Sequence, residues 1–209
     1  MPVPQQLEAF RQAREDTFEL VAPLSQEQLD YSPAPGKWSP GEVLDHLSKT
    51  DSMYRREIAL LVDLARSGRR PYAKRRFADL DAAPAAVPKS WLRFLEVPFG
   101  LMSRLMPKSL GAAMAANRTI HFQHPEGATP RRGRPAAELN RDLRASFQAL
   151  ESLFADNPDL DWASMIHQHP LFGVNSVPEI LDFITAHDRR HQAQIRDVLA
   201  SPRFPRAAA

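Results

Sequence analysis

Apolar residues recur every three or four positions along four stretches of the chain, whereas alternating runs of β-branched residues are scarce. That spacing places the apolar side chains on one face of a helix, which then packs against a core. The pattern predicts long helices over about residues 4–21, 40–65 and 135–156, and a fourth that begins after Ser176 and ends before Pro202. A short additional turn of helix is expected between the first two.

Two of these helices begin with the same local signature. Ser39 is followed by Pro40 and, three residues after the serine, by Glu42; Ser176 is followed at the same distance by Glu179. In such a capping box the serine hydroxyl and the glutamate carboxylate bind backbone N–H groups that have no partner in the first turn. Proline is favoured there because it has no N–H group to leave unpaired.

The segment 66–134 does not continue the helical pattern, because prolines and glycines interrupt it. Two apolar stretches at 91–97 and 99–106 predict short helices that cover the bundle, with a dimer contact or a hydrophobic lid as the alternatives. We therefore predict an all-α protein with a single domain over residues 1–209. It is a four-helix bundle with a long, partly helical insertion at about 66–134, between the second and third main helices.

Composition limits the chemistry. The chain has no cysteine, which excludes disulfides, thiolate ligands and a cysteine nucleophile. Any metal must therefore bind nitrogen or oxygen, and any thiol must come from another molecule. No run of about 18 apolar residues occurs, and residues 1–6 lack the basic start and apolar run of a secretory signal. We expect a cytoplasmic protein without a membrane span.

The formal net charge is +2, and the basic excess is local. Residues 66–76 contain arginines and a lysine but no acid, and Arg131, Arg132 and Arg134 form a second cluster. We expect solvated loops, with attraction of an anionic small molecule or a partner surface as the alternative. Nucleic-acid binding would also need groove-reading or stacking elements, and none is recognisable, so no nucleic-acid partner is predicted.

Histidines carry the candidate chemistry. His187 and His191 are four residues apart on the last predicted helix, so both imidazoles lie on one face and can reach one metal ion. His46, within the apolar stripe of the second helix, is the best candidate to complete the site. Asp188 stands where a zincin has glutamate, which disfavours a metalloprotease. Asp45 and Asp188 adjoin histidines but point about 100° away around their helices, so neither is expected to bind a histidine N–H group.

Five other residues are weaker candidates. His167 and His169 are expected to be loop residues and not ligands. His121 and His124 lie in the insertion and can face the mouth of a cavity. Trp38 precedes the capping serine of the second helix, where its ring either packs over the helix start or forms a pocket wall.

Three segments together resemble the DinB-like superfamily, whose members are four-helix bundles, often dimeric, with a divalent metal held by three histidines. The segments are Lys37-Trp38-Ser39-Pro40-Gly41-Glu42-Val43-Leu44-Asp45-His46-Leu47, His169-Pro170-Leu171-Phe172-Gly173 and His187-Asp188-Arg189-Arg190-His191-Gln192-Ala193-Gln194-Ile195. The resemblance covers about the first 65 and the last 75 residues. It does not cover about 70–130, where this chain is longer than the compact family pattern.

The resemblance implies that His46, His187 and His191 are the ligands of a divalent metal. Zinc and nickel both suit imidazole, and manganese and iron are the alternatives. Three neutral imidazoles leave a coordination position open for water or substrate. An ion there can lower the pKa of a bound water or of an incoming thiol, so that an anionic nucleophile exists near neutral pH.

The superfamily includes thiol-dependent S-transferases and a maleylpyruvate isomerase that uses a thiol cofactor, and many members have no known activity. The resemblance thus implies a metal-dependent enzyme, a thiol S-transferase or a hydrolase, that acts on a small-molecule substrate, with a small thiol as cosubstrate, as a homodimer. The alternatives are a non-catalytic metal-binding bundle that acts in stress response or through a partner, and a dimeric bundle whose metal is structural. An enzyme needs an open coordination position that faces a pocket.

Overall fold

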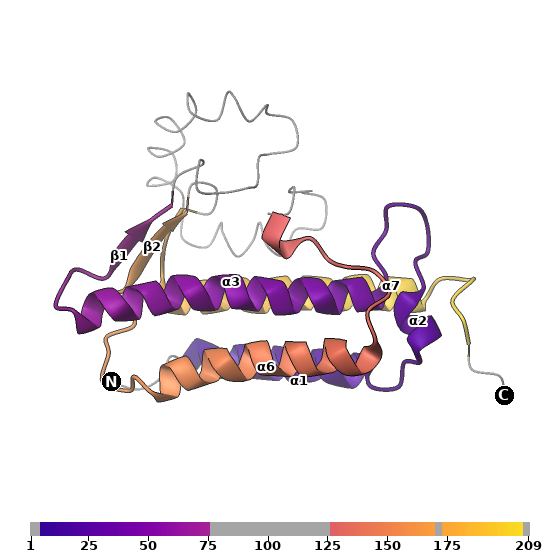
Figure 1. Ribbon diagram of the computed structural model, residues 1–209, viewed down its shortest axis with the longest axis horizontal. Coiled ribbons are helices and arrows are strands. Elements are labelled where there is room, and N and C mark those ends of the chain that lie inside the picture. The colour runs from indigo at the N-terminus through magenta and orange to yellow at the C-terminus, as the bar shows by residue number, and fades with distance from the viewer. Residues whose placement is uncertain (1–4, 76–125, 170–172, 207–209) are drawn as a thin grey trace, which may run out of the picture.

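The computed structural model describes residues 5–75, 126–169 and 173–206. The elements within these ranges are α1 (Gln5–Val21), α2 (Gln26–Asp30), α3 (Pro40–Arg66), β1 (Tyr72–Lys74), η3 (Glu126–Ala128), α6 (Ala136–Ala155), β2 (Ile166–His169), β3 (Gly173–Ser176) and α7 (Val177–Leu199). The four long helices run along one another, with α3 and α7 above α6 and α1 in the view of Figure 1. α3 packs chiefly against α6, and α1 packs chiefly against α7. The predicted four-helix bundle is confirmed, and the helix ends agree to within one or two residues.

The apolar core of the bundle is divided in two along its length. One cluster lies toward the strands and is formed chiefly by Phe10, Ile58, Leu61, Phe147, Leu150, Phe154, Leu181 and Ile184. The other lies toward α2 and is formed by Phe18, Val21, Leu29, Val43, Leu44, Leu47, Leu139, Leu143 and Ile195. Each long helix contributes to both clusters, because its apolar stripe runs along most of its length.

The predicted capping signals shape the starts of α3 and α7. The backbone N–H of Glu42 donates to the Ser39 hydroxyl at 3.2 Å, and the N–H of Ser39 donates to the Glu42 carboxylate at 2.9 Å. At the second site the N–H of Ser176 donates to the Glu179 carboxylate at 2.7 Å. The helices that carry the three candidate ligands therefore both start where the sequence predicts.

A three-stranded sheet in the order β1-β2-β3 lies beyond the bundle and was not predicted. β1 runs parallel to β2, and β2 runs antiparallel to β3. The strands are three or four residues long and contain polar residues such as His167 and Gln168 at buried positions, so they lack the alternating pattern that identifies a strand. His167 and His169 consequently lie on β2, and their prediction as loop residues was wrong.

The described ends of the predicted insertion are β1 and η3. The two predicted short helices at 91–97 and 99–106, together with His121 and His124, lie outside the described residues. Within the described part of the chain, no helix combines the length and the apolar character that crossing a membrane requires.

Most described residues of the two basic clusters are exposed, as predicted, and Arg134 is the exception. Arg66 binds Asp159 across the surface, with N–O distances of 2.7 Å. The side chain of Arg134 is only 10% exposed, and it donates to Asp45 at 2.7 Å. A buried carboxylate draws this arginine out of water, and the spacing of basic residues alone does not reveal such a distant partner.

Candidate metal centre

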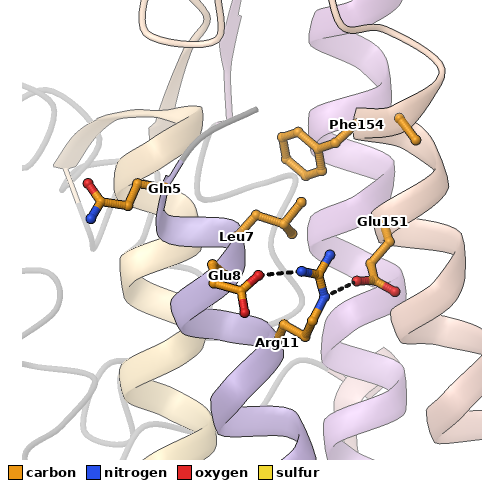
Figure 2. A pocket seen from close by; sticks show the side chains of 7 residues that line it. Gln5, Leu7, Glu8, Arg11, Glu151 and Phe154 are labelled. Atoms are coloured by element: carbon orange, nitrogen blue, oxygen red, sulfur yellow. Dashed lines mark hydrogen bonds and ion pairs between the residues drawn. The ribbon is translucent and has the colours of Figure 1, made fainter. Parts of the chain in front are cut away.

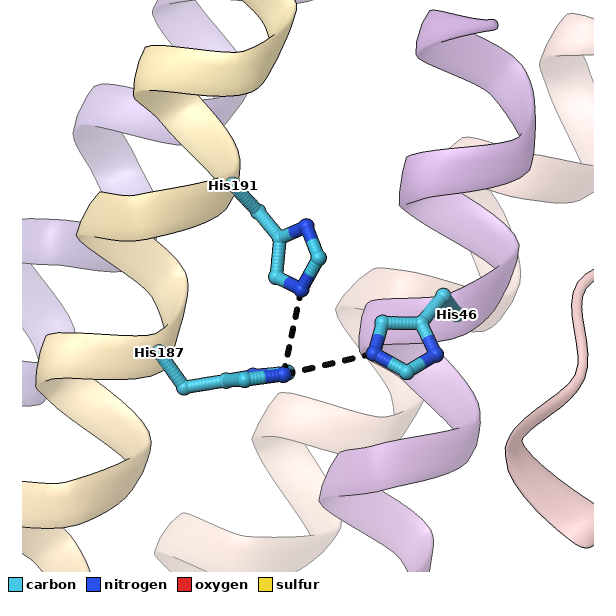
Figure 3. Close-up of side chains that lie close together, drawn as sticks. All are labelled: His46, His187 and His191. Atoms are coloured by element: carbon cyan, nitrogen blue, oxygen red, sulfur yellow. Dashed lines mark hydrogen bonds between the residues drawn. The ribbon is translucent and has the colours of Figure 1, made fainter. Parts of the chain in front are cut away.

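Three histidine side chains converge between α3 and α7 (Figure 3). His46 extends from α3 toward His187 and His191, which extend from adjacent turns of α7. His46 and His191 are 2% and 4% exposed, whereas His187 is half-buried. The sequence predicted these three residues as one cluster, and the structure brings them together.

The ring nitrogens are spaced as a small metal ion requires. The Nε2 atom of His187 lies 3.3 Å from Nε2 of His46 and 3.1 Å from Nε2 of His191. One nitrogen from each of the three rings lies within 4.8 Å of the other two. In a tetrahedral site with zinc–nitrogen bonds of 2.0–2.1 Å, neighbouring ligand nitrogens are about 3.3 Å apart. The donor set and its spacing therefore fit a divalent ion.

Two protein oxygens fix the direction in which the rings point their lone pairs. His46 Nδ1 lies 2.7 Å from the carbonyl oxygen of Ala128 in η3, and His191 Nδ1 lies 2.9 Å from the amide oxygen of Gln194. Because these oxygens only accept hydrogen bonds, each Nδ1 carries a proton, and Nε2 is the nitrogen that remains to bind an ion. Such hydrogen bonds orient metal-binding histidines and raise their basicity.

Sequence reasoning missed both acceptors. Gln194 follows His191 by three residues, which places it on the same face one turn later, so helical spacing could have identified it. The Ala128 carbonyl carries no sequence signal, because every residue has one and only the fold brings η3 over α3. The expectation for Asp45 and Asp188 is confirmed, since Asp45 binds Lys49 and Arg134, and Asp188 binds Arg14.

Aromatic rings border the histidines. The Trp38 ring centroid lies 4.8 Å from that of His46 and 6.0 Å from that of His191, with which it is nearly parallel. The Phe183 ring is stacked 6.4 Å from the His187 ring. Trp38 therefore packs on the apolar cluster at the start of α3, which was one of its two predicted roles, and its ring also borders two of the three histidines. An apolar wall keeps water away from a site and strengthens the electrostatic interactions inside it.

A model of the DinB superfamily matches residues 9–195. The chain belongs to the DinB superfamily. The chain is 24% identical over 195 residues to the uncharacterized protein YuaE of Bacillus subtilis (strain 168), an alignment that covers 90% of this chain and 94% of YuaE.

The fold is also similar to a solved structure. It is YfiT from Bacillus subtilis, described as a probable metal-dependent hydrolase with an unusual four-helix bundle topology. The TM-score is 0.52 at 13% identity, with 94% of this chain and 85% of YfiT covered. At that identity the likeness supports the fold of this DinB-superfamily protein and not its activity.

A small cavity lies behind Phe183 in this DinB-superfamily protein. It has a volume of about 20 Å³ and is lined by Tyr54, His167, His169, Asn175, Ile180 and Phe183. A cavity of that size has room for about one water molecule. Since Phe183 also stacks on His187, the cavity and the histidine cluster share a wall.

The surroundings of this cavity lower the pKa values of Glu57 and His169. His167 Nε2 lies 3.2 Å from Glu57, which also binds Arg75. Burial alone would raise the pKa of Glu57, but His167 and Arg75 outweigh it and lower that pKa to about 2. Burial, and then the neighbouring His167, lower the pKa of His169 to about 3, so His169 is uncharged at neutral pH.

Two larger hollows contain none of the three histidines. One, of about 480 Å³, lies between the start of α1 and the end of α6, where Arg11 binds both Glu8 and Glu151 (Figure 2). The other, of about 450 Å³, lies between α3 and α6 and carries Lys49 and Arg55 among its lining residues. Neither contains a described group of side chains that could hold a metal.

Proposed function

We propose that this DinB-superfamily protein is a metal-dependent enzyme in which His46, His187 and His191 hold a divalent ion, zinc or nickel. When bound, the ion supplies Lewis acidity that lowers the pKa of a water or of a small thiol cosubstrate. The observation that carries the proposal is the convergence of three Nε2 atoms, two of which have their Nδ1 atoms tied to oxygens that only accept hydrogen bonds.

The number of ligands supports a reactive site over a structural one. Among the residues that the structure describes, the group of His, Asp or Glu side chains that could hold an ion has three members. Closed structural zinc sites have four protein ligands, whereas catalytic sites have three and keep one position for water or substrate. His187 is the partly exposed member of the three, and it marks the side from which a small-molecule substrate would approach.

The other residues of the centre have supporting roles in this proposal. Ala128 and Gln194 hold protons at Nδ1 of His46 and His191, so that Nε2 stays free to bind. Trp38 and Phe183 limit water around the rings. The description of YfiT as a probable metal-dependent hydrolase favours attack by water on a small electrophilic substrate, and the lack of cysteine makes any thiol an external cosubstrate.

Metal analysis of the purified protein tests the first step. We expect about one divalent ion per chain in the wild type and none in His187→Ala. His167→Gln is the matched control, because it removes a buried histidine outside the cluster, and it should keep its ion. A wild-type protein that binds no divalent ion after incubation with zinc or nickel would refute the proposal.

Activity assays test the second step. Protein loaded with zinc, nickel, manganese or iron is tested for hydrolysis of small esters and amides, and for the transfer of small thiols to electrophiles. Turnover should disappear in His187→Ala and persist in Arg66→Ala, whose ion pair with Asp159 lies on the surface. Stoichiometric metal without turnover under every loading would identify a non-catalytic metal-binding bundle instead.

The enzyme is proposed to act as a homodimer, as the resemblance to the superfamily implies. Light scattering coupled to gel filtration gives the molar mass of the protein in solution. A mass near twice the 23.5 kDa of the chain is expected, and a mass of one chain would contradict this part of the proposal.

A further inference from the structure

A buried layer of polar side chains crosses the middle of the bundle, between the two apolar clusters. All four long helices contribute to it, through Arg14, Thr17, Asp51, Ser146, Asp188 and Gln192. At its centre is the guanidinium of Arg14, which is 0% exposed. A buried charge of this kind requires partners, and Arg14 has them on two other helices.

Arg14 joins the two helices that carry the candidate metal ligands. Its terminal nitrogens donate to both carboxylate oxygens of Asp51 on α3, at 2.9 and 3.1 Å. Its Nε donates to Asp188 on α7 at 3.2 Å. Asp188 is adjacent to His187 in sequence, and Asp51 lies little more than one helical turn after His46. One planar guanidinium group therefore bridges the two helices that position the histidines.

Two polar residues of α7 that contact α1 also fix the rotation of α7 about its axis. Asp188 and Gln192 are four residues apart and face α1, where Gln192 donates to the Ala13 carbonyl at 2.6 Å and to the Thr17 hydroxyl at 3.1 Å. His187 and His191 each precede one of these residues by a single position. Because successive side chains on a helix differ by about 100°, holding the first pair against α1 aims the second pair at α3.

We propose that Arg14 is a positioning residue for the metal centre, which sets the separation and rotation of α3 and α7 so that three imidazoles meet before any ion arrives. The inference rests on the proposed metal site. Arginine suits this role because its planar group presents several N–H donors in a fixed geometry, which lysine cannot reproduce.

Stability alone does not account for the layer. Replacing buried ion pairs by apolar residues of similar volume is often neutral or stabilising, so an ionic layer is a poor device for strengthening a core. Metal affinity, in contrast, depends on ligands that are held in place by a supporting shell. A layer that touches both ligand-bearing helices, and lies between two apolar clusters, fits the second purpose.

Cobalt(II) binding to the full chain tests the proposal, because its visible absorption reports the geometry of the ligands. Arg14→Lys keeps the positive charge and loses the fixed fork, and we expect cobalt affinity to fall about 10- to 100-fold, with an altered spectrum. Asp51→Asn keeps the side-chain shape but weakens the ion pair between Arg14 and α3, so it should also lower cobalt affinity. It provides the test if Arg14→Lys does not fold. Phe154→Leu, in the apolar cluster near the strands, is the control for a general loss of core packing.

A metal-free measurement separates positioning from binding. In nitrogen-15 spectra of the apo-protein, we expect the rings of His46 and His191 to be held as the Nδ1–H tautomer in the wild type and in Phe154→Leu, and to show averaged tautomers in Arg14→Lys. The inference would be overturned if Arg14→Lys and Asp51→Asn fold and keep wild-type cobalt affinity and spectra. It would also be overturned if Phe154→Leu loses as much cobalt affinity as they do. If the wild type binds no cobalt, the proposed function fails; if the wild type binds it and the variants bind equally well, only the role of Arg14 fails.

Discussion

The two buried polar clusters of the bundle differ in what completes them. Around Arg14, a cation of the protein meets carboxylates of the protein, and most of the polar atoms have partners within the chain. In the histidine cluster, three rings turn nitrogens toward one another, and the group of possible metal ligands found among the described residues holds no Asp or Glu. Lone pairs that face each other repel unless a proton or a cation lies between them. The first cluster is therefore held mainly by ion pairs and hydrogen bonds between charged groups of the chain, whereas the second presents the donor atoms of a metal site.

The contrast arises from adjacent positions on one helix. His187 and Asp188 differ by a single step along α7, yet they take part in clusters on different sides of it. Burial raises the pKa of Asp188 to about 6, although Arg14 acts in the opposite direction. The same helix thus carries a structural residue and a candidate ligand side by side, and only their directions around the axis distinguish them.

Removing one member of each cluster in metal-free buffer tests whether the two clusters differ in their contribution to stability. Arg14→Met leaves Asp51 and Asp188 buried without their cation, and we expect the free energy of unfolding to fall by about 3–5 kcal/mol. His46→Ala leaves no unpaired charge and should cost only about 1–2 kcal/mol. Urea denaturation followed by circular dichroism measures both. Equal losses would mean that the two clusters do not differ as described.

Adding metal should stabilise the folded protein through the histidine cluster. A free ion concentration 100 times the dissociation constant raises the free energy of unfolding by about 2.7 kcal/mol when only the folded state binds. We expect this gain in the wild type and none in His187→Ala, measured by urea denaturation with and without zinc. A similar gain in both proteins would place the ion elsewhere in the chain.

The acceptor for His191 should affect metal affinity more than stability. Gln194→Ala removes the oxygen that holds the proton at Nδ1 of His191, and we expect zinc affinity to fall about 10- to 100-fold. Gln12→Ala is the matched control, because Gln12 forms an exposed bond to Asp16 on α1. Competition with a chromophoric chelator measures the affinity. Unchanged affinity in Gln194→Ala would show that the hydrogen bond does not support the site.

The smallest expected change in stability comes from a third, partly exposed charge cluster, formed by Glu57, Arg75 and His167. The folded-state pKa of Glu57 is about 2, below its ordinary value of 4.5, so its contribution to stability is present above about pH 4.5 and is lost as the pH falls toward 2. We expect the wild type to lose about 1–2 kcal/mol more than Glu57→Gln over that window, since solvent near Arg75 screens the interaction. Parallel pH dependences in urea denaturation would exclude this role for Glu57.

The sequence by itself determined the four long helices, both capping sites and the membership of the histidine cluster. These features depend on local chemistry: the apolar spacing, the serine–proline–glutamate signals and the four-residue separation of His187 and His191 all act within a few turns of helix. His46 could be added because a resemblance linked two distant segments, which spacing alone does not do.

Tertiary structure decided the rest. The short strands form because Tyr72 and Gly173 are brought beside β2, and no local pattern marks them. The Ala128 carbonyl reaches His46 across 82 positions of the chain, and Arg14 reaches Asp188 across 174. Hydrogen bonds and ion pairs of this kind depend on distances and directions between helices, which are fixed only when the whole core packs. The residues that could hold a metal were therefore predictable, whereas those that aim them became visible only in the folded chain.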